Sequence, residues 1–269
     1  MNMGYSGQRA VVTGCASGIG AALCVQLVSL GAQVHGFDVR QPADCDPAMR
    51  FSQLDLRDPL AIARAAGTIA PSVDLLFNCA GLSSVAPPMD VVRVNFIGMR
   101  SFAEAVISRM QRGGRIATVA SIAGANWNNR LDTVRALVDT EDYAAADAWA
   151  AAHPDSVGAG YALSKEACIV WTMTRAARDA ARGLRFNCLC PGSVATPMLH
   201  ELQKQGRGHV VDAIQQPSGR PSTPAEQAGL LLFLNSDVAS YVNGHALVAD
   251  GGYTAALTIG ETPRAAFTK

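Results

Sequence analysis

The stretch RAVVTGCASGIG at residues 9–20 sets the fold class of this chain of 269 residues. Residues 9–13 are mostly apolar and β-branched, which is typical of a strand covered on both faces. Gly14, Gly18 and Gly20 follow, and they allow a tight turn, close backbone approach to a pyrophosphate, and close packing of a helix on the strand. The start of such a helix offers free N–H groups and a positive dipole end to phosphate. The stretch therefore predicts a strand–turn–helix that binds a dinucleotide.

The rest of the chain continues the alternation of short apolar runs and longer helical patterns. The patterns predict strands at 9–13, 33–38, 50–53, 73–78, 115–120, 185–189 and 246–249, and helices at 18–30, 58–70, 90–112, 160–181 and 224–235. Such alternation gives a parallel sheet with right-handed crossovers. We therefore predict an α/β fold: a single doubly wound (Rossmann) domain over residues 1–269, with a seven-stranded, mostly parallel sheet and helices on both faces.

Two stretches interrupt this alternation. Residues 122–159 form an insertion between a strand and the next long helix, with an Ala-rich, helical piece around 131–152. Residues 197–222, rich in Pro, Gly and Gln, are predicted to form a loop or small helical flap. Both follow the carboxyl ends of strands, where doubly wound folds bind ligands, so we expect them to border the substrate.

Composition narrows the classes of function. The chain has 22 Lys+Arg and 22 Asp+Glu, so its formal net charge is zero, and the sequence offers no basic patch for nucleic acid or acidic membranes. No apolar run reaches a membrane span, and we expect a cytoplasmic protein. The 7 cysteines are odd in number and fit no metal or redox spacing, so free thiols and no metal site are predicted. Only 16% of residues are charged, which favours a homo-oligomer.

Asp38 indicates which dinucleotide the chain binds. It ends the second predicted strand, where a carboxylate can hydrogen-bond both hydroxyls of the adenosine ribose. A carboxylate at this point repels the 2′-phosphate of NADP, so NAD is the predicted cofactor. Arg40 lies two residues further on and weakens that discrimination.

Tyr161 and Lys165 carry the predicted chemistry. They stand four residues apart in a helical pattern, so the hydroxyl and the ammonium can point into one cleft. An ordinary tyrosine has a pKa near 10, too high for a general base at neutral pH. A cation about 4–5 Å away can lower that pKa by roughly two to three units. The pair is therefore predicted to exchange protons with a substrate, although the same spacing also occurs in ordinary helices with a solvated lysine.

Several motifs occur in order and together resemble the short-chain dehydrogenase/reductase family of the classical type. They are TGCASGIG (13–20), Asp38, Asp55-Leu56, Asn78-Cys79-Ala80-Gly81, Asn95, Ser121, Tyr161/Lys165, Pro191-Gly192 and Asp250-Gly251-Gly252. Within the family the chain is most similar to the group of 3α-hydroxysteroid dehydrogenase/carbonyl reductase and coniferyl-alcohol dehydrogenase. That group shares the long insertion before the tyrosine helix.

The resemblance implies roles for individual residues. Tyr161 would be the general acid/base, Lys165 would assist it and bind the nicotinamide ribose, Ser121 would bind the substrate oxygen, and Asn95 would hold a proton-relaying water. The cofactor residues implied are Gly14, Ser17, Gly18, Ile19, Gly20, Asp38, Asp55, Leu56, Asn78, Ala80, Gly81, Tyr161, Lys165, Pro191, Gly192, Val194 and Thr196. Asp55 would contact the adenine amino group, and Val194 and Thr196 would hold the carboxamide of the nicotinamide.

The predicted substrate pocket is apolar around two polar groups. Its residues are Ser83, Ser121, Ile122, Ala123, Trp127, Met198, Leu199 and Leu202. Such a lining suits a hydrophobic alcohol or ketone. A tryptophan of the insertion can equally pack it against the body, which is the favoured interpretation for Trp149.

The expected activity is NAD-dependent interconversion of a secondary alcohol and its ketone. Steroid, aryl and cyclic alcohols remain open as substrates. The alternative is a catalytically silent dinucleotide-binding sensor, but such proteins typically lack the tyrosine or the lysine. Enoyl reductases of the family space these two residues more widely, and epimerases carry a larger C-terminal domain. A homodimer through residues 224–249 is preferred to the tetramer usual in the family, because the insertion borders the surface used by that tetramer.

Overall fold

The computed structural model describes residues 4–43, 46–207 and 216–262. In this part of the chain seven strands form one sheet, and every pairing between neighbouring strands is parallel. The order across the sheet is β3-β2-β1-β4-β5-β6-β7. The strands are β1 (Arg9–Thr13), β2 (Gln33–Asp38), β3 (Arg50–Gln53), β4 (Val73–Asn78), β5 (Met110–Val119), β6 (Arg185–Pro191) and β7 (Ala246–Ala249). The strand order reverses between β1 and β4, which opens a crevice at their carboxyl ends.

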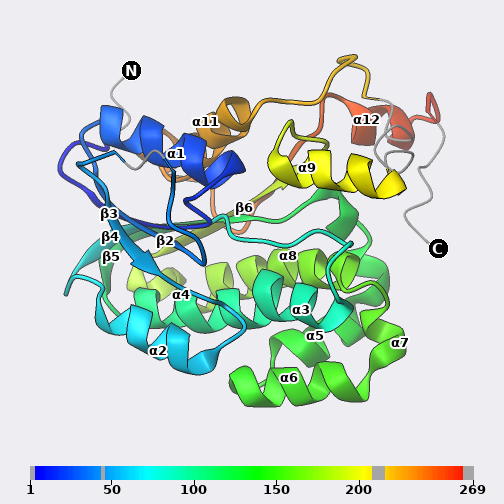
Figure 1. Cartoon of the computed structure of the whole chain (residues 1–269), viewed down its shortest axis with the longest axis horizontal. Helices are drawn as coiled ribbons and strands as arrows, with labels where there is room; N and C mark the ends of the chain where they lie inside the picture. Colours follow the sequence, from blue (N-terminus) through cyan, green and yellow to red (C-terminus); the bar gives the residue numbers. More distant parts are fainter. Residues whose placement is uncertain (1–3, 44–45, 208–215, 263–269) are drawn as a thin grey trace.

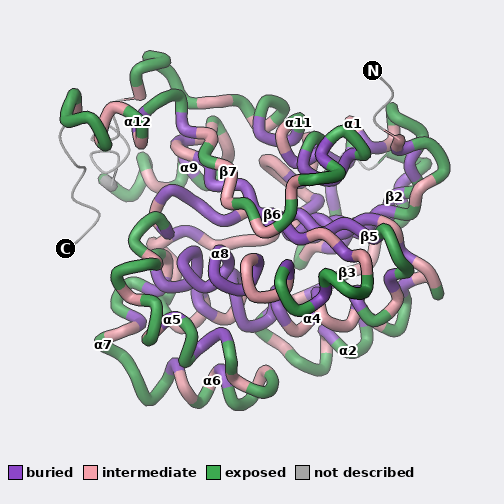
Figure 2. The backbone as a smooth tube through the Cα atoms, turned by 180° about the vertical axis from the view of Figure 1, so that it is seen from behind, coloured by how far each residue is buried: buried purple, intermediate pink, exposed green. Residues whose placement is uncertain are grey.

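Helices cover both faces of the sheet, so the strands are apolar on both sides (Figures 1 and 2). One face carries α1 (Gly18–Ser29) and α11 (Pro224–Leu234), which pack on residues such as Val12, Leu75 and Leu189. The other face carries α2 (Pro59–Gly67), α4 (Met99–Ile107) and α8 (Tyr161–Arg178). The predicted doubly wound, single-domain α/β fold is confirmed, and the sheet is entirely parallel rather than mostly so.

The predicted helix at 90–112 differs from the structure in two ways. It begins earlier, as α3 (Pro88–Val92), passes through a π-helical turn at Arg93–Gly98 and continues as α4. It also ends earlier, because β5 already begins at Met110, which pairs with Val73 of β4. The prediction was wrong at this end because residues 108–112 have a helical pattern that is overridden by pairing in the sheet.

The insertion forms a separate layer on the outer side of α4 and α8 (Figure 1). Its helices are α5 (Leu131–Val138), α6 (Tyr143–Ala152) and α7 (Pro154–Val157). The Ala-rich piece predicted around 131–152 is therefore two helices. The break arises because the Asp142 side chain accepts a hydrogen bond from the N–H of Ala145 at 2.8 Å and so starts a new helix.

The flap predicted at 197–222 is partly described. It begins with α9 (Pro197–Leu202) and a π-helical turn at Gln203–Arg207, and residues 208–215 lie outside the described residues. The chain continues through α11 and β7 to α12 (Tyr253–Thr258). Short 3-10 turns stand at 122–124, 127–130, 180–182 and 237–239. In the described ranges, none of the helices combines the length and apolarity that crossing a membrane requires.

Candidate active site

A cavity of about 1340 Å³ lies at the carboxyl ends of the strands. It runs from Asp38 at the end of β2, past the turn between β1 and α1, to Ser121 after β5 and Tyr161 at the start of α8. The topology thus brings together residues that are more than a hundred positions apart in the sequence. This is the crevice in which doubly wound sheets bind their ligands.

The glycine turn after β1 is packed too tightly for side chains. A Cβ on Gly14, whose φ is +74°, would lie 2.6 Å from the nitrogen of Ala80. A Cβ on Gly20 would lie 2.1 Å from the carbonyl oxygen of Gly14, and Gly20 does not line the cavity. Gly20 therefore allows helix and strand to pack, as the sequence predicts.

The start of α1 faces the same cavity with its N–H groups. The residue before the helix, Ser17, makes no capping hydrogen bond with its side chain, and the first turn contains no acidic residue. Ser17, Gly18 and Ile19 all line the cavity. The first N–H groups of a helix have no partners within it, so this end can bind an anion such as a pyrophosphate.

The Asp38 carboxylate is held in a fixed orientation at one end of the cavity. One oxygen accepts a hydrogen bond from the N–H of Ala16 at 3.0 Å, and the other accepts one from the N–H of Arg40 at 3.0 Å. An ionised carboxylate has about four acceptor positions. Two therefore remain for ribose hydroxyls. Arg40 lines the cavity as well.

Asp55 and Leu56 form the neighbouring wall together with Arg57. The guanidinium of Arg57 binds both oxygens of Asp55, with its Nη2 atom 2.7 Å from Oδ2. These hydrogen bonds hold the pKa of Asp55 below its ordinary value. Asp55 is therefore an ionised acceptor at this wall. Arg57 was not predicted as a site residue, and no motif in the sequence singles it out.

Tyr161, Lys165 and Ser121 line the opposite end of the cavity. The Nζ atom of Lys165 lies 5.7 Å from the centre of the Tyr161 ring and donates to the carbonyl oxygen of Val119 at 2.9 Å. Lys165 is only 4% exposed, so this bond fixes its direction. The hydroxyl of Ser121 accepts a hydrogen bond from the N–H of Ala123 at 3.1 Å, which leaves its proton available to a ligand.

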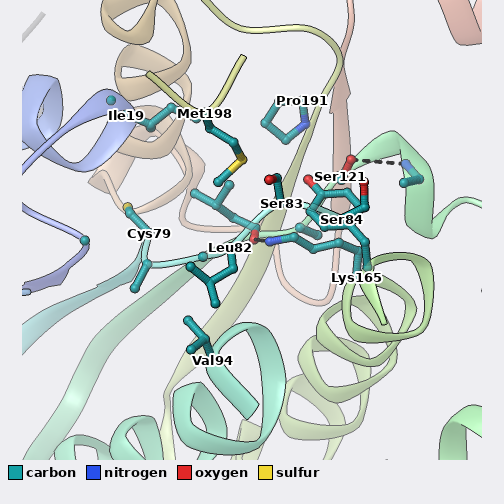
Figure 3. Close-up of a pocket in the computed structure, with 18 of the residues that line it drawn as sticks. Ile19, Cys79, Leu82, Ser83, Ser84, Val94, Ser121, Lys165, Pro191 and Met198 are labelled. Carbon is teal, nitrogen blue, oxygen red and sulfur yellow. Dashed lines mark hydrogen bonds between the residues drawn. The ribbon is translucent and has the colours of Figure 1, made fainter. Parts of the chain in front are cut away.

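Figure 3 shows how the close-up residues are distributed around the cavity. Ser83, Ser84 and Ser121 are drawn on the same side as Lys165, and Ile19 and Cys79 are drawn on the other side. Met198 comes from α9, whereas Val94 comes from the π-helical turn. The labelled polar side chains are therefore gathered on the Lys165 side of the cavity.

Asn95 lies in the π-helical turn and is almost fully buried. Its side chain accepts from the N–H of Leu82 at 2.6 Å and donates to the carbonyl oxygen of Leu82 at 3.0 Å and to Ser164 at 3.2 Å. A Cβ on Gly81 would lie 3.3 Å from Asn95 Oδ1 and 3.7 Å from Lys165 Nζ. The bare backbone of Gly81 thus leaves space beside both polar groups.

The remaining predicted residues divide into two sets. Ala80, Pro191, Gly192, Val194, Thr196, Ser83, Ile122, Ala123, Met198, Leu199 and Leu202 line the cavity. Asn78 and Trp127 do not border it, and neither does Asn95. Asn78 ends β4 and is paired with Thr118 of β5, and its buried amide donates to the Thr118 hydroxyl at 3.1 Å. Trp127 packs against the main hydrophobic core, which is also where Trp149 packs.

Sequence reasoning missed part of the wall. Leu82 and Val94 line the cavity, as do Arg130, Thr133 and residues 155–159. Residues 155–159 could have been predicted as part of the wall, because they lie just before Tyr161 in the sequence. Arg130 and Thr133 belong to the insertion that the sequence expects to border the substrate, but their individual positions depend on how the insertion packs. The described residues contain no group of His, Cys, Asp and Glu side chains able to hold a metal ion.

Comparisons with known proteins agree over nearly the whole chain. The family model for short chain dehydrogenase matches residues 8–132, and a related model described as Enoyl-(Acyl carrier protein) reductase matches residues 142–254. Coniferyl-alcohol dehydrogenase of Pseudomonas sp. (strain HR199 / DSM 7063) is 35% identical over 93% of this chain and 98% of its own length. 3-alpha-hydroxysteroid dehydrogenase/carbonyl reductase of Comamonas testosteroni is 33% identical over 92% of this chain and 96% of its own.

Among solved structures, the 3-alpha-hydroxysteroid dehydrogenase of Pseudomonas sp. B-0831, crystallised with NADH, superimposes with a TM-score of 0.80. It is 30% identical in sequence, and the match covers 95% of this chain and all of that one. The similarity therefore extends over nearly the whole fold.

Proposed function

The chain belongs to the short-chain dehydrogenase/reductase family of oxidoreductases, and we propose that it is an NAD-dependent enzyme interconverting a hydrophobic secondary alcohol and its ketone. One observation carries this proposal. A single cavity joins a carboxylate suited to an adenosine ribose, an uncapped helix start suited to phosphates, and a Ser-Tyr-Lys group suited to an alcohol.

The residues around the cavity fit a nicotinamide dinucleotide. Asp38 would bind the adenosine ribose, Asp55 and Leu56 the adenine, and the start of α1 the pyrophosphate. The segment from Pro191 to Thr196 would hold the nicotinamide, with Val194 and Thr196 on its carboxamide. When bound, the cofactor accepts or donates the hydride. Asp38, Asp55 and Leu56 border the same cavity as Ser17, Gly18 and Ile19 of the α1 start and Pro191, Gly192, Val194 and Thr196, which supports the assignment.

We assign the proton transfer to Tyr161. Its hydroxyl would take the proton of the alcohol on oxidation and return it to the carbonyl oxygen on reduction. Ser121 would donate to the same oxygen and stabilise its developing charge. Lys165 would stabilise the tyrosinate, since its ammonium is held beside the Tyr161 ring. Asn95 would connect this group to solvent through a water beside Gly81.

NAD is preferred to NADP in this proposal because of Asp38. The carboxylate is oriented by the N–H groups of Ala16 and Arg40, and a 2′-phosphate beside it would be repelled. The related enzyme of Pseudomonas sp. B-0831 was crystallised with NADH. Arg40 lines the cavity close to Asp38, so the discrimination is a preference and not an exclusion.

The cavity wall supports a hydrophobic substrate. Near the Ser-Tyr-Lys group it is lined by Leu82, Val94, Ile122, Met198 and Leu199. Two related proteins are named for coniferyl alcohol and for 3-alpha-hydroxysteroids, and we propose aryl and cyclic alcohols as further candidates. The common requirement is a rigid apolar body next to the reacting carbon.

The test is NADH formation, followed by absorbance, with hydroxysteroids, aryl carbinols, coniferyl-type alcohols and cyclic alcohols, using NAD and NADP in parallel. We expect turnover concentrated in one of these classes and faster with NAD. Binding of NADH without turnover of any alcohol would contradict the proposal. That outcome would favour the alternative of a catalytically silent sensor.

We also propose a cytoplasmic homodimer, joined through residues 224–249, in preference to a homotetramer. Strand β7 forms one edge of the sheet, and Phe233, Val238, Tyr241 and Val248 expose apolar surface in this region. Exposed apolar side chains gathered in one region favour association. Light scattering on Val248→Glu tests the idea: the mass should fall to that of a monomer, and an unchanged mass would contradict this interface.

A further inference from the structure

We propose that the substrate cavity has a second polar end, formed by Arg130, Thr133, Asp155 and Ser156, that binds a hydroxyl group on the far end of the substrate. This inference rests on the proposed function, because it concerns the alcohol that Tyr161 and Ser121 would receive. It adds to that function a substrate with an oxygen at each end of a rigid apolar body.

The four residues form one continuous stretch of the cavity wall. All of them line the cavity. Arg130 directly precedes α5, and its Nη2 atom donates to the carbonyl oxygen of Ser156 at 2.7 Å. Asp155 is the neighbour of Ser156 in α7, and Thr133 lies in the first turn of α5, three residues after Arg130. Two segments of the insertion thus meet at this polar end.

The Arg130 guanidinium is held in place by hydrogen bonds to the protein. Its Nη1 atom donates to the carboxylate of Glu166 at 3.1 Å, and the Glu166 side chain is only 2% exposed. A guanidinium has five N–H groups, and Glu166 and Ser156 engage one each. In the described part of the chain no other acceptor binds it. Donors therefore remain that can serve a ligand without any change in the fold.

The charges at this end favour a neutral hydroxyl group over a carboxylate. The positive charge of Arg130 is already balanced by Glu166, and Asp155 adds a second carboxylate. Within the described residues Asp155 has no ion pair. A substrate carboxylate would therefore meet two negative charges and one positive. A hydroxyl group can accept from Arg130 and donate to Asp155, which satisfies both.

The wall between the two ends is short and mostly apolar. It is formed by Val157, Gly158 and Ala159, which lead directly from Ser156 to Tyr161. Five residues of chain span at most ~17 Å when fully extended. The Cα atoms of Ser156 and Tyr161 therefore lie within that distance, so one ring or a small ring system can extend from Tyr161 toward the polar end.

The first experiment measures binding, so that it does not depend on turnover. Calorimetry with the enzyme saturated with oxidised cofactor compares acetophenone, para-hydroxyacetophenone and para-acetylbenzoate, together with the biphenyl ketones with and without a para-hydroxyl on the far ring. The hydroxylated ketone should bind about tenfold more tightly than its parent in at least one pair, as expected for one well-placed polar group. The benzoate should bind more weakly than its parent.

Variants separate this role from a purely structural one. Asp155→Asn should reduce the hydroxyl preference at least threefold and improve binding of para-acetylbenzoate, because a repelling charge is removed. Asp132→Asn is the matched control, since Asp132 is an exposed carboxylate on the same insertion that does not line the cavity. It should change neither affinity.

The outcomes distinguish this inference from the proposed function. Equal binding of hydroxylated and parent ketones, no binding of any of them, or the same response in both variants would overturn the polar end. A hydroxyl preference with no turnover of any alcohol would leave the polar end standing and refute the dehydrogenase. Turnover without a hydroxyl preference would refute the polar end and leave the dehydrogenase standing.

Discussion

Replacing Arg100 with methionine tests whether one buried cation holds the insertion against the body of the protein. Arg100 projects from α4, and its guanidinium donates to the main-chain carbonyls of Val138, Thr140 and Asp142 at 3.0, 2.9 and 2.8 Å. The residue is 2% exposed, and burial lowers the pKa of its guanidinium from the ordinary value. These hydrogen bonds fix residues 138–142, which connect α5 to α6, against α4.

The expected magnitude follows from what the lost donors leave behind. Methionine retains much of the aliphatic volume, so the change is mainly a loss of hydrogen bonds, each contributing about 1.5–3 kcal/mol for a charged donor. The desolvation cost of burying the guanidinium offsets part of the stabilisation from these hydrogen bonds, and its Nε atom has no partner in the described residues. Water can replace the donor at half-buried Thr140 and exposed Asp142, but not at buried Val138. We expect the free energy of unfolding to fall by about 2–4 kcal/mol.

The assay is thermal unfolding by circular dichroism combined with hydrogen exchange. At about 2–4 °C per kcal/mol, Tm should fall by roughly 4–16 °C. Exchange should accelerate first in residues 131–152. Because Arg130 and Thr133 belong to the insertion, KM for the alcohol should rise more than KM for the cofactor.

A matched control lies on the insertion itself. Arg135 pairs with Asp139 at 3.3 Å on the surface and is 57% exposed, so Arg135→Met should change the free energy of unfolding by less than about 0.5 kcal/mol. Equal Tm values for the two variants would refute the reasoning. So would a lowered Tm in Arg100→Met with exchange in residues 131–152 no faster than in the rest of the chain.

Three further predictions concern the site and the pH dependence of stability. Tyr161→Phe should reduce turnover by about 10³ or more while NADH still binds, as followed by cofactor fluorescence; a variant with a tenth of the original activity would exclude Tyr161 as the acid/base. Asp38→Ala should bring kcat/KM for NAD and NADP closer together, and an unchanged ratio would show that Asp38 does not bind the ribose. Burial, with a smaller effect of Arg50, lowers the pKa of His35 to about 4. Below pH about 6.5 the unfolded chain therefore binds a proton at His35 that the folded protein does not bind. The free energy of unfolding should fall as the pH is lowered from that value to about 4. Urea unfolding from pH 8 to 4 should show a weaker decline in His35→Gln, and identical curves would contradict the assignment.

Much of the fold was predictable because its signals are local. The β1–α1 turn needs glycines that are neighbours in the sequence, and Tyr161 and Lys165 share a helix face simply because they stand four residues apart. Strands covered on both faces can also be recognised in the sequence as short apolar runs. Boundaries were less certain, as β5 shows, since pairing of Met110 with Val73 depends on a strand far away in the sequence.

The sequence by itself determined the fold class, the glycine turn and the Tyr-Lys pair, because each depends on residues a few positions apart whose geometry the backbone sets. Only the tertiary structure decided that Asn78 and Trp127 lie away from the cavity, that Asn95 is held by Leu82 and Ser164, and that Arg130 reaches Glu166. Contacts of this kind join segments separated by many residues. They exist only after the insertion and the helices have packed, so no local pattern encodes them.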